Sequence, residues 1–387
     1  MKWKFYSLAF VAGMSILTAC SSDDNNDNDG NGNGNEIENG TILKGTITSD
    51  VTLAAGNTYK LSGEYIVEEG ATLHIEEGVK IIAVYDDIAD YILVKQGGKI
   101  NAVGTPDKPI VMTSEKEEPG AWGGIHICGR AHTNAEGGKG SSEIGGAVYG
   151  GNDDADNSGT LQYIRLEYTG FAFDEEHEAN GISFYSVGNG TIVDHCQAYK
   201  GSDDGFEFFG GSVNVSNLVA VSCSDDSFDW TEGWNGKGTN LVAYQEAEST
   251  LGYDCDCLME CDNNGSNNAA TPVAHPVLKN LILVGNGGSK QGIRLRAGTE
   301  VEIDNAKVCG KGQPLTVETA LTENALKNGT SKLTNITLTS ELSSKEGIYT
   351  HADFIAVTSN KVDANLSYSS FEDIRKECSW MNGSWVK

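Results

Sequence analysis

A phrase of about ten residues occurs twice in the sequence, at a constant offset. The first copy reads DDGFEFFGG (203–211) and the second reads DDSFDWTEGW (225–234). Phe206 and Phe208 of the first copy correspond to Phe228 and Trp230 of the second. Similarity at a fixed period of this size is typical of stacked supersecondary units, not of one globular core. The sequence therefore predicts a solenoid.

Apolar residues alternate with polar ones in each copy. In a β-strand, Phe206 and Phe208 would point inward and Glu207 outward. The same spacing recurs in five segments, whose predicted inward pairs are Ile125/Ile127, Ile182/Phe184, Phe206/Phe208, Phe228/Trp230 and Ile293/Leu295. The predicted outward side chains form two rows. The first row is His126, Ser183, Glu207, Asp229 and Arg294, and the second is Cys128, Tyr185, Phe209, Thr231 and Arg296.

A second, longer type of strand alternates with the first. It has an Asx residue at a matching bend, and Asx side chains satisfy backbone groups at bends. The unit is strand, bend, strand, turn, in about 20–30 residues. We therefore predict an all-β, right-handed parallel β-helix, a single-stranded solenoid. The bend residues are Asp194, Asn217, Asn240, Asn280, Asn305 and Asn335.

The predicted β-helix is one domain that spans residues 41–387. Two insertions, 129–159 and 245–276, interrupt the repeat, and both are expected to be loops that leave the solenoid. The end of the chain, 369–387, contains a short predicted helix at 371–378. Because a solenoid needs a cap over its last coil, we assign this role to 369–387.

The start of the chain is typical of a secreted lipoprotein. Residues 1–19 form a signal peptide with a charged start and a short apolar run. Cys20 follows Leu-Thr-Ala and resembles the lipidated cysteine of a bacterial lipobox. Residues 20–40 are acidic and almost without apolar residues, which predicts a disordered tether. Serines and acids after Cys20 resemble the export signal of Bacteroidetes-type lipoproteins, so the outer face of the outer membrane is the expected location.

The charge of the chain limits its partners. The formal net charge is −28, which argues against nucleic acid and against anionic membrane surfaces. Eight cysteines besides Cys20 are an even number, and outside the cytoplasm they permit disulfides. The spacing Cys255-x-Cys257-x3-Cys261 also suits a soft metal, although it is not that of a common zinc site. Disulfides are the preferred interpretation.

The paired acids suggest a metal. Asp203, Asp204, Asp225 and Asp226 offer the carboxylate oxygens that Ca²⁺ prefers. Stacked like charges about 4.8 Å apart would otherwise repel one another. The alternative is that the first Asp of each pair caps its turn through backbone N–H groups.

Aromatic rings beside carboxylates suggest a sugar-binding face. The candidate ligand-binding residues on this face are Tyr185, Glu207, Phe209, Asp229, Trp234 and Arg294. The alternative is that Tyr185 and Phe209 pack beneath an insertion.

Catalysis on the same face is a second hypothesis. A polysaccharide lyase would use Arg294 or Arg296 as its base, and an inverting hydrolase would use Asp203, Asp204, Asp225 and Asp226. No lyase or hydrolase motif is recognisable, so no catalytic residue is assigned.

GAWGGIHICGRA (120–131), NGISFYSVGNGTIVDH (180–195) and the DD-x-F-[ED] phrases resemble an uncharacterised family of Bacteroidetes surface lipoproteins with a pectate-lyase-like solenoid. The resemblance implies a fold and a location but no activity. We therefore expect a monomeric, lipid-anchored surface protein that binds extracellular glycan or an envelope or host protein without catalysis. The alternatives are an enzyme acting on an acidic glycan and an accessory lipoprotein of an outer-membrane transporter.

Overall fold

The computed structural model describes residues 35–86, 88–173 and 177–387. These residues belong to one compact unit. The predicted signal peptide, Cys20 and residues 20–34 of the predicted tether lie outside the described residues, so lipidation stays a prediction. The tether is predicted to extend to residue 40, but β1 (Asn35–Ile37) already pairs with β3 (Val51–Leu53) in the stack. Within the described ranges, no helix is both long and apolar enough to cross a membrane.

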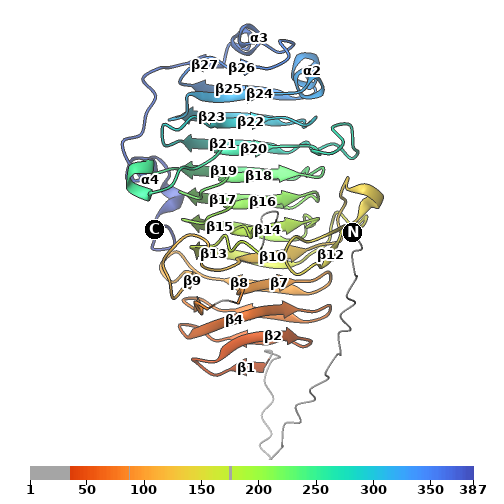
Figure 1. Cartoon of the computed structure of the whole chain (residues 1–387), viewed down its shortest axis with the longest axis vertical. Coiled ribbons are helices and arrows are strands. Elements are labelled where there is room, and N and C mark those ends of the chain that lie inside the picture. Colours follow the sequence, from red (N-terminus) through yellow and green to blue (C-terminus); the bar gives the residue numbers. More distant parts are fainter. Residues whose placement is uncertain (1–34, 87, 174–176) are drawn as a thin grey trace, which may run out of the picture. The chain divides into compact units, whose positions relative to one another are not determined.

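The described chain is a right-handed parallel β-helix, as predicted. Its strands form one 25-stranded sheet, and each strand between the two ends pairs in parallel with strands of the coil before it and the coil after it. In Figure 1 the coils lie one above another, from β1 (Asn35–Ile37) and β2 (Ile42–Ile47) at one end to β26 (Ser343–Ser344) and β27 (Lys361–Val362) at the other. A single antiparallel hairpin lies outside this sheet in the described residues.

Short strands line one face of each coil. In phase with one another, all of them except the last, which consists of two serines, carry an inward, apolar pair and outward, mostly polar side chains. They are β7 (Tyr91–Val94), β10 (Ile125–Cys128), β14 (Ile182–Tyr185), β16 (Phe206–Phe209), β18 (Phe228–Thr231), β20 (Met259–Cys261), β22 (Gln291–Leu295), β24 (Gln313–Val317) and β26 (Ser343–Ser344).

Longer, bent strands complete the coils. They are β13 (Gly159–Glu167), β15 (Ile192–Tyr199), β17 (Asn214–Val221), β19 (Lys237–Tyr244), β21 (Val277–Val284), β23 (Glu302–Cys309), β25 (Lys332–Leu338) and the short β27 (Lys361–Val362). The two halves of β13 pair with two separate strands, β8 (Lys99–Val103) and β9 (Ile110–Ser114). The first coils contain β1 (Asn35–Ile37), β2 (Ile42–Ile47), β3 (Val51–Leu53), β4 (Thr58–Val67), β5 (Thr72–Ile75) and β6 (Lys80–Ala83).

The bend of each long strand is a residue in the left-handed region. Asparagine tolerates this region better than other non-glycine residues, and its φ is +55° at Asn217, +59° at Asn240 and +60° at Asn280. Asn305 and Asn335 continue the row. In β15 the bend residue is His195 (φ +54°), so the prediction of Asp194 is wrong by one residue. The Asp194 carboxylate instead accepts hydrogen bonds from the side chains of the next coil.

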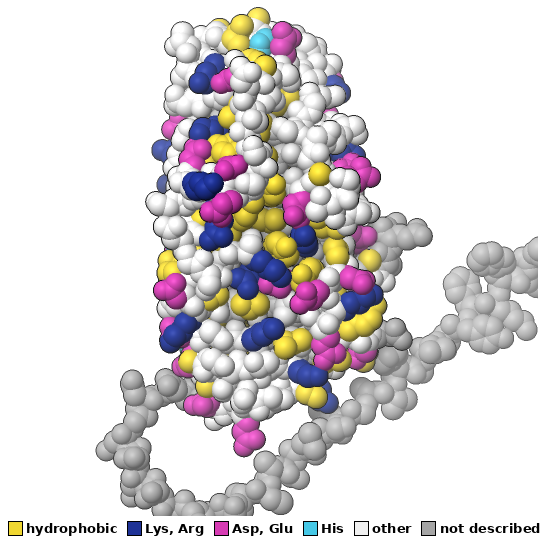
Figure 2. Space-filling model, turned by 90° about the vertical axis from the view of Figure 1, so that its left-hand side faces the viewer, with side chains coloured by type: hydrophobic (Ala, Val, Ile, Leu, Met, Phe, Trp, Pro, Cys, Tyr) yellow, Lys and Arg dark blue, Asp and Glu magenta, His cyan; other side chains and the backbone are white. Residues whose placement is uncertain are grey.

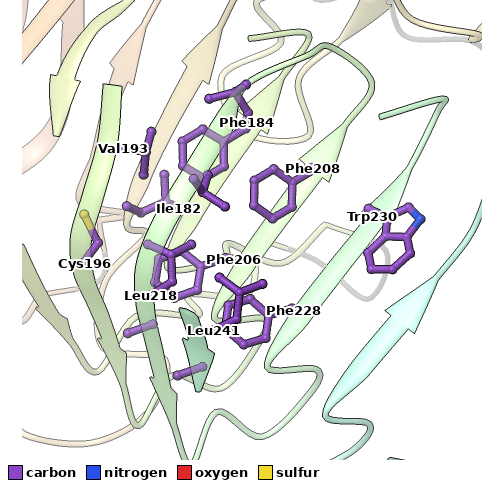
Figure 3. Close-up of a cluster of buried hydrophobic side chains, with 14 of the residues drawn as sticks. Ile182, Phe184, Val193, Cys196, Phe206, Phe208, Leu218, Phe228, Trp230 and Leu241 are labelled. Carbon is purple, nitrogen blue, oxygen red and sulfur yellow. The ribbon is translucent and has the colours of Figure 1, made fainter. Parts of the chain in front are cut away.

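The predicted inward pairs fill the core. All ten side chains of these pairs are at most 2% exposed. Phe184 stacks on Phe208 with 5.0 Å between ring centroids, and Phe206 stacks on Phe228 at 5.6 Å. Figure 3 shows these rings in columns along the axis, opposite Val193, Leu218 and Leu241 of the long strands.

The two predicted insertions differ. The first, 129–159, leaves the stack and contains η1 (Glu136–Gly138) and the hairpin of β11 (Gly140–Ser141) and β12 (Val148–Tyr149). The second, 245–276, is not all loop: after α1 (Glu248–Leu251), β20 joins the stack between β18 and β22. The loop that contains α1 lengthens this coil, so its spacing differs from that of the other coils and the repeat is not visible in the sequence. The predicted insertion 245–276 is therefore corrected, because it includes β20, a strand of the stack.

The C-terminal segment does not cap the last coil, contrary to the prediction. Helices α2 (Ala320–Asn328) and α3 (His351–Ala356) lie at that end instead (Figure 1). The predicted short helix is present as α4 (Phe371–Glu377), followed by η2 (Ser379–Met381). This segment packs on the outer side of the long strands because Ile374, Met381 and Trp385 bury themselves against Val242 and Ile282. Figure 2 views this side and shows apolar side chains gathered in the middle of the stack.

The predicted disulfides are absent from the described residues. Cys128, Cys196, Cys223, Cys255, Cys257, Cys261, Cys309 and Cys378 are all buried free thiols. Buried free cysteine behaves as a small apolar residue, which is how the core uses Cys196 and Cys261. Burial also raises the pKa of the Cys223 thiol to about 12, so it carries little thiolate.

Candidate functional site

Three consecutive short strands align acids on the outside of the stack. Glu207 of β16 pairs with Asp229 of β18, and Asp229 pairs with Glu260 of β20. Ser183 of β14 precedes this row and Arg294 of β22 follows it. Because successive strands are about 4.8 Å apart, the register forces these side chains together.

A second acidic row lies where the chain enters these strands. The pairs Asp203-Asp204 and Asp225-Asp226 precede β16 and β18 by the same number of residues. Asp204 Oδ1 accepts a hydrogen bond from the backbone N–H of Asp226 (2.8 Å), and Asp226 Oδ1 accepts one from the N–H of Cys257 (2.6 Å). The second Asp of each pair therefore binds the backbone of the following coil. The Asp203 carboxyl, the first of its pair, is hydrogen-bonded by the backbone N–H of Asp204 within its own turn.

The two rows open into one cavity of about 490 Å³. Its lining is strongly acidic, with ten carboxylates, one amide and one guanidinium. The lining residues are Glu143, Glu178, Asn180, Asp203, Asp204, Glu207, Asp225, Asp226, Asp229, Asp256, Glu260 and Arg294. All four aspartates predicted for calcium, and Glu207, Asp229 and Arg294 of the predicted ligand face, meet here.

The three predicted aromatic ligand residues are not on this surface. Tyr185 is 1% exposed; its ring stacks on Phe209 at 4.5 Å and contacts the tilted ring of Tyr149, from the first insertion, at 5.1 Å. Trp234 is 1% exposed and stacks on the core ring of Phe208 at 4.1 Å. The prediction that these rings are exposed is wrong, because the 129–159 insertion covers Tyr185 and Phe209 and because Trp234 turns inward.

Several of the residues that line the cavity were not predicted from the sequence. Asp256 and Glu260 stand at the positions of Asp225 and Asp229 in the next coil, a relation that the register of β18 and β20 establishes. The segment DCLMEC (256–261) does carry the acid-x3-acid spacing, but Met259 and Cys261 replace the aromatic pair. Glu143 comes from the first insertion, and no local pattern connects it with the repeat.

Burial and mutual repulsion raise the pKa of most of these carboxyls. The pKa of Asp203 rises to about 7, first through burial and then through the charge of Asp225. The pKa values of Asp204, Glu207, Asp226 and Asp229 are well above the usual range, again mainly through burial and then through neighbouring acids. Protons or another cation must therefore neutralise part of the cluster.

The ion pairs with basic side chains lie at one end of the cavity. Glu260 binds both Arg294 (Nη1 to Oε2, 2.8 Å) and Arg296, which also binds Asp262. Asp256 is paired with Lys290. In the described chain, no lysine or arginine makes an ion pair with the six acids of the two preceding coils, which are Asp203, Asp204, Glu207, Asp225, Asp226 and Asp229.

The two arginines proposed as lyase bases are held in ion pairs. Glu318 and Glu260 raise the pKa of Arg294 by hydrogen bonding and charge against the opposing effect of burial. Asp262 and Glu260 do the same for Arg296. A guanidinium in this setting resists loss of its proton, so the geometry does not favour either as a base.

Comparison with known proteins gives a family. The sequence model of the pectate-lyase-like β-helix domain matches residues 45–386. Among solved structures, the Dettilon tailspike protein (gp208) is similar over 77% of this chain, with 9% sequence identity and a TM-score of 0.31. The matched part is 56% of the length of that tailspike chain. No curated protein matches the sequence.

Proposed function

Because this chain belongs to the family of pectate-lyase-like β-helix domains, we propose that it binds extracellular glycans at the acid-lined cavity, with Ca²⁺ as part of the binding site. The observation that carries the proposal is the cluster of six acids that make no ion pair with a lysine or arginine of the described chain. A hard cation held by carboxylates keeps coordination positions open for other oxygens. Sugar hydroxyls and carboxylates are suitable oxygens for these positions.

The lining of the cavity supports an ion-mediated mode of binding over ring stacking. Tyr185, Phe209 and Trp234 are buried, so no ring of the predicted ligand face is free to stack on a sugar. The cavity volume of about 490 Å³ accommodates a small number of sugar units. Glu207 and Asp229 offer carboxylate oxygens to sugar hydroxyls, in addition to their role toward the ion.

The cellular setting completes the proposal. Lipidation of Cys20 would tether the β-helix to the outer membrane through the acidic segment that follows, with the cavity outside the cell. An envelope or host protein, or a transporter partner, remains the alternative occupant if no glycan binds.

A glycan array tests the proposal. The protein is applied to the array in Ca²⁺ and in EDTA, and binding that requires Ca²⁺ is expected. The Asp229→Asn variant should lose this binding, whereas the exposed Glu341→Gln variant should retain it. Binding of equal strength in EDTA would contradict the role of the ion, and absence of binding to every glycan would contradict the ligand class.

A glycoside hydrolase is a second candidate, supported by one observation. Burial raises the pKa of Asp203 to about 7, and an inverting hydrolase needs one protonated carboxyl beside an ionised one. If this is the function, glycans that bind should be released with new reducing ends, and Asp203→Asn should abolish this release. Recovery of only intact glycan would exclude it.

A further inference from the structure

Equivalent turns of two adjacent coils bring a lysine and an asparagine together. One turn connects β21 to β22 and the other connects β23 to β24, and in Figure 1 these coils lie one above the other. The register of β21 and β23 continues into the turns, where the N–H of Gly287 donates to the carbonyl oxygen of Gly310 (2.6 Å). Asn286 and Lys311 therefore hold the same position in successive coils, and the register places their side chains next to each other.

Lys311 is buried without a charged partner. It is 3% exposed, and its Nζ donates to two neutral oxygens, the backbone carbonyl of Cys255 (3.0 Å) and the Oδ1 of Asn286 (2.9 Å). Within the described ranges it makes no ion pair, although a fully buried lysine ordinarily has one. Burial lowers the pKa of the Lys311 ammonium, against the opposing charge of Asp254. A larger share of this lysine is therefore the neutral amine, which is the nucleophilic form.

Three neighbours hold the amide of Asn286 in one orientation. Its Oδ1 accepts hydrogen bonds from Lys311 Nζ and from the backbone N–H of Gly288 (3.0 Å). Its Nδ2 donates to Asp254 Oδ1 (2.8 Å). Because a C=O bond is about 1.23 Å long, Lys311 Nζ lies no more than about 4.1 Å from Asn286 Cγ. Reacting atoms about 3–3.5 Å apart are close enough to react, so a small movement of the lysine brings its amine to the carbonyl carbon.

Two glycines of the turn after β21 make room for this arrangement. A Cβ at Gly285 would lie 2.5 Å from Lys311 Cγ and 2.8 Å from its Cδ, so a side chain there would displace the lysine. A Cβ at Gly288 would lie 2.9 Å from Asp254 Oδ1 and 3.0 Å from Asn286 Oδ1, so a side chain there would separate the acid from the amide. The lysine, the amide and the carboxylate meet because this turn lacks side chains at these two positions.

The lysine, the asparagine and the aspartate are not part of the lining of the acidic cavity, and they form a site of their own. Lysine supplies a nucleophile, asparagine an electrophilic carbonyl carbon, and aspartate a proton acceptor. We propose that Lys311 and Asn286 form an intramolecular isopeptide bond, a covalent cross-link between adjacent coils, with Asp254 as the catalytic acid–base residue. The cross-link goes beyond the proposed function and does not depend on it.

The reaction exchanges one amide for another. Once the ammonium has lost a proton to water, Lys311 Nζ attacks Asn286 Cγ, and the C–N bond forms as an electron pair moves onto Oδ1. The N–H of Gly288 stabilises the negative oxygen. Asp254 accepts the proton that Nζ gives up and passes it to Nδ2. The bond between Cγ and Nδ2 then breaks, ammonia leaves, and the carbonyl is restored. No group is oxidised or reduced, and no further reactant is consumed.

Mass spectrometry of tryptic peptides from the parent protein tests the proposal directly. Trypsin should release a branched peptide in which 280–290 is joined to 308–327, because an acylated Lys311 is no longer a cleavage site. Its mass should equal that of the two peptides less one ammonia, and fragmentation should place the bond between Asn286 and Lys311. Recovery of only separate peptides, with cleavage after Lys311, would overturn the proposal.

Three variants assign the roles of the residues. Lys311→Arg keeps a positive charge but removes the nucleophile, so the branched peptide should be lost completely. Asp254→Asn keeps the shape of the acid but removes the proton acceptor, and it should slow cross-linking by about a hundredfold or more. The exposed Lys345→Arg variant is the control and should cross-link like the parent protein. Circular dichroism verifies that each variant keeps the β-helix. Cross-linking of Asp254→Asn at the parent rate would overturn the role of Asp254.

A competing reaction of Asn286 has a different product. Asn286 precedes Gly287, and an Asn-Gly sequence also loses ammonia when the backbone nitrogen of the glycine closes a succinimide on the asparagine side chain. This product contains no branched peptide and does not require Lys311. Loss of ammonia that persists in Lys311→Arg, without a branched peptide in the parent protein, would assign the chemistry to the succinimide and overturn the cross-link.

Discussion

At the scale of single residues, the fold tolerates buried charge at a few positions outside the cavity, and Asp90 is the clearest. It is 1% exposed. Its Oδ1 accepts the backbone N–H of Gly63, whereas its Oδ2 has no hydrogen-bond partner among the described residues. Burial, opposed by the Gly63 hydrogen bond, raises the pKa of Asp90 to about 6. The free energy of unfolding should therefore depend on pH through Asp90.

The direction of this dependence follows from proton linkage. Between pH 3.8, the ordinary pKa of aspartate, and about 6, the folded state holds a proton that the unfolded state has lost. Stability from this group is therefore present at low pH and is lost as the pH rises through this window. We expect Asp90→Asn to raise the free energy of unfolding by about 2 kcal/mol at pH 8 and to leave it nearly unchanged at pH 4.

Urea denaturation of both proteins at the two pH values measures this difference. Asn can keep the hydrogen bond from Gly63 through its Oδ1, so the substitution removes the charge and little else. The exposed Asp107→Asn variant is the control. A variant that is destabilised equally at both pH values would show that Asp90 is ionised and satisfied in the folded state.

At the scale of elements, the bends of the long strands form a continuous ladder of amides. Asn280 Nδ2 donates to Asn240 Oδ1 (3.0 Å), and Asn305 Nδ2 donates to Asn280 Oδ1 (2.8 Å). Each of these residues is also in the left-handed region. Asparagine thus has two roles at the bend, one in backbone conformation and one in linking adjacent coils.

Two substitutions at Asn280 separate these roles. Asn280→Gly keeps the left-handed backbone and loses both ladder hydrogen bonds, and it should cost about 1–2 kcal/mol. Asn280→Ala loses the same hydrogen bonds and adds backbone strain, so it should cost about 1 kcal/mol more than the glycine variant. Chemical denaturation measures both. If the two variants were equally stable, the left-handed backbone conformation at the bend would not contribute to the free energy of unfolding.

The elements show what the sequence could and could not predict. The inward pairs, such as Phe206 and Phe208, were predictable because alternation along a strand depends only on neighbouring residues. The bend asparagines were predictable for the same reason. The burial of Tyr185 depends on where the 129–159 insertion folds, and no residue near Tyr185 determines that.

The candidate site was predictable in part for a related reason. The aspartates of the two similar copies share an offset, so their proximity followed from the repeat. Glu260 and Asp256 lie in the next coil after a longer connection, and Met259 and Cys261 obscure the match. The neutralisation of Glu260 by two arginines depends on side-chain geometry across coils, which a single sequence does not specify.

At the scale of the whole molecule, the C-terminal segment connects coils that are far apart in the stack. Lys307 of β23 is paired with Glu377 of α4. At its other end, Arg165 Nη1 of β13 donates to the carbonyl oxygen of Ser384 (2.6 Å), and the N–H of Ser384 donates to the carbonyl oxygen of Pro106 (2.8 Å). Coils of a solenoid otherwise contact only their neighbours, so this segment adds a direct link between the early and central coils.

Trp385 is the main apolar contact of this link, and its removal tests the role of the segment. The side chain is fully buried and meets the His195 ring at 5.2 Å and the Tyr163 ring at 6.1 Å, in both cases edge to face. Trp385→Ala should cost about 3–5 kcal/mol. Because the link joins distant coils, we expect the loss to appear as earlier exchange of amide hydrogens in β8, β9 and β13, while β22 to β25 remain protected.

Hydrogen exchange followed by mass spectrometry measures this difference. Trp380→Ala, at a half-buried position of the same segment, is the control and should change exchange less. Equal acceleration of exchange in all coils would mean that the segment stabilises the stack as a whole and does not link particular coils.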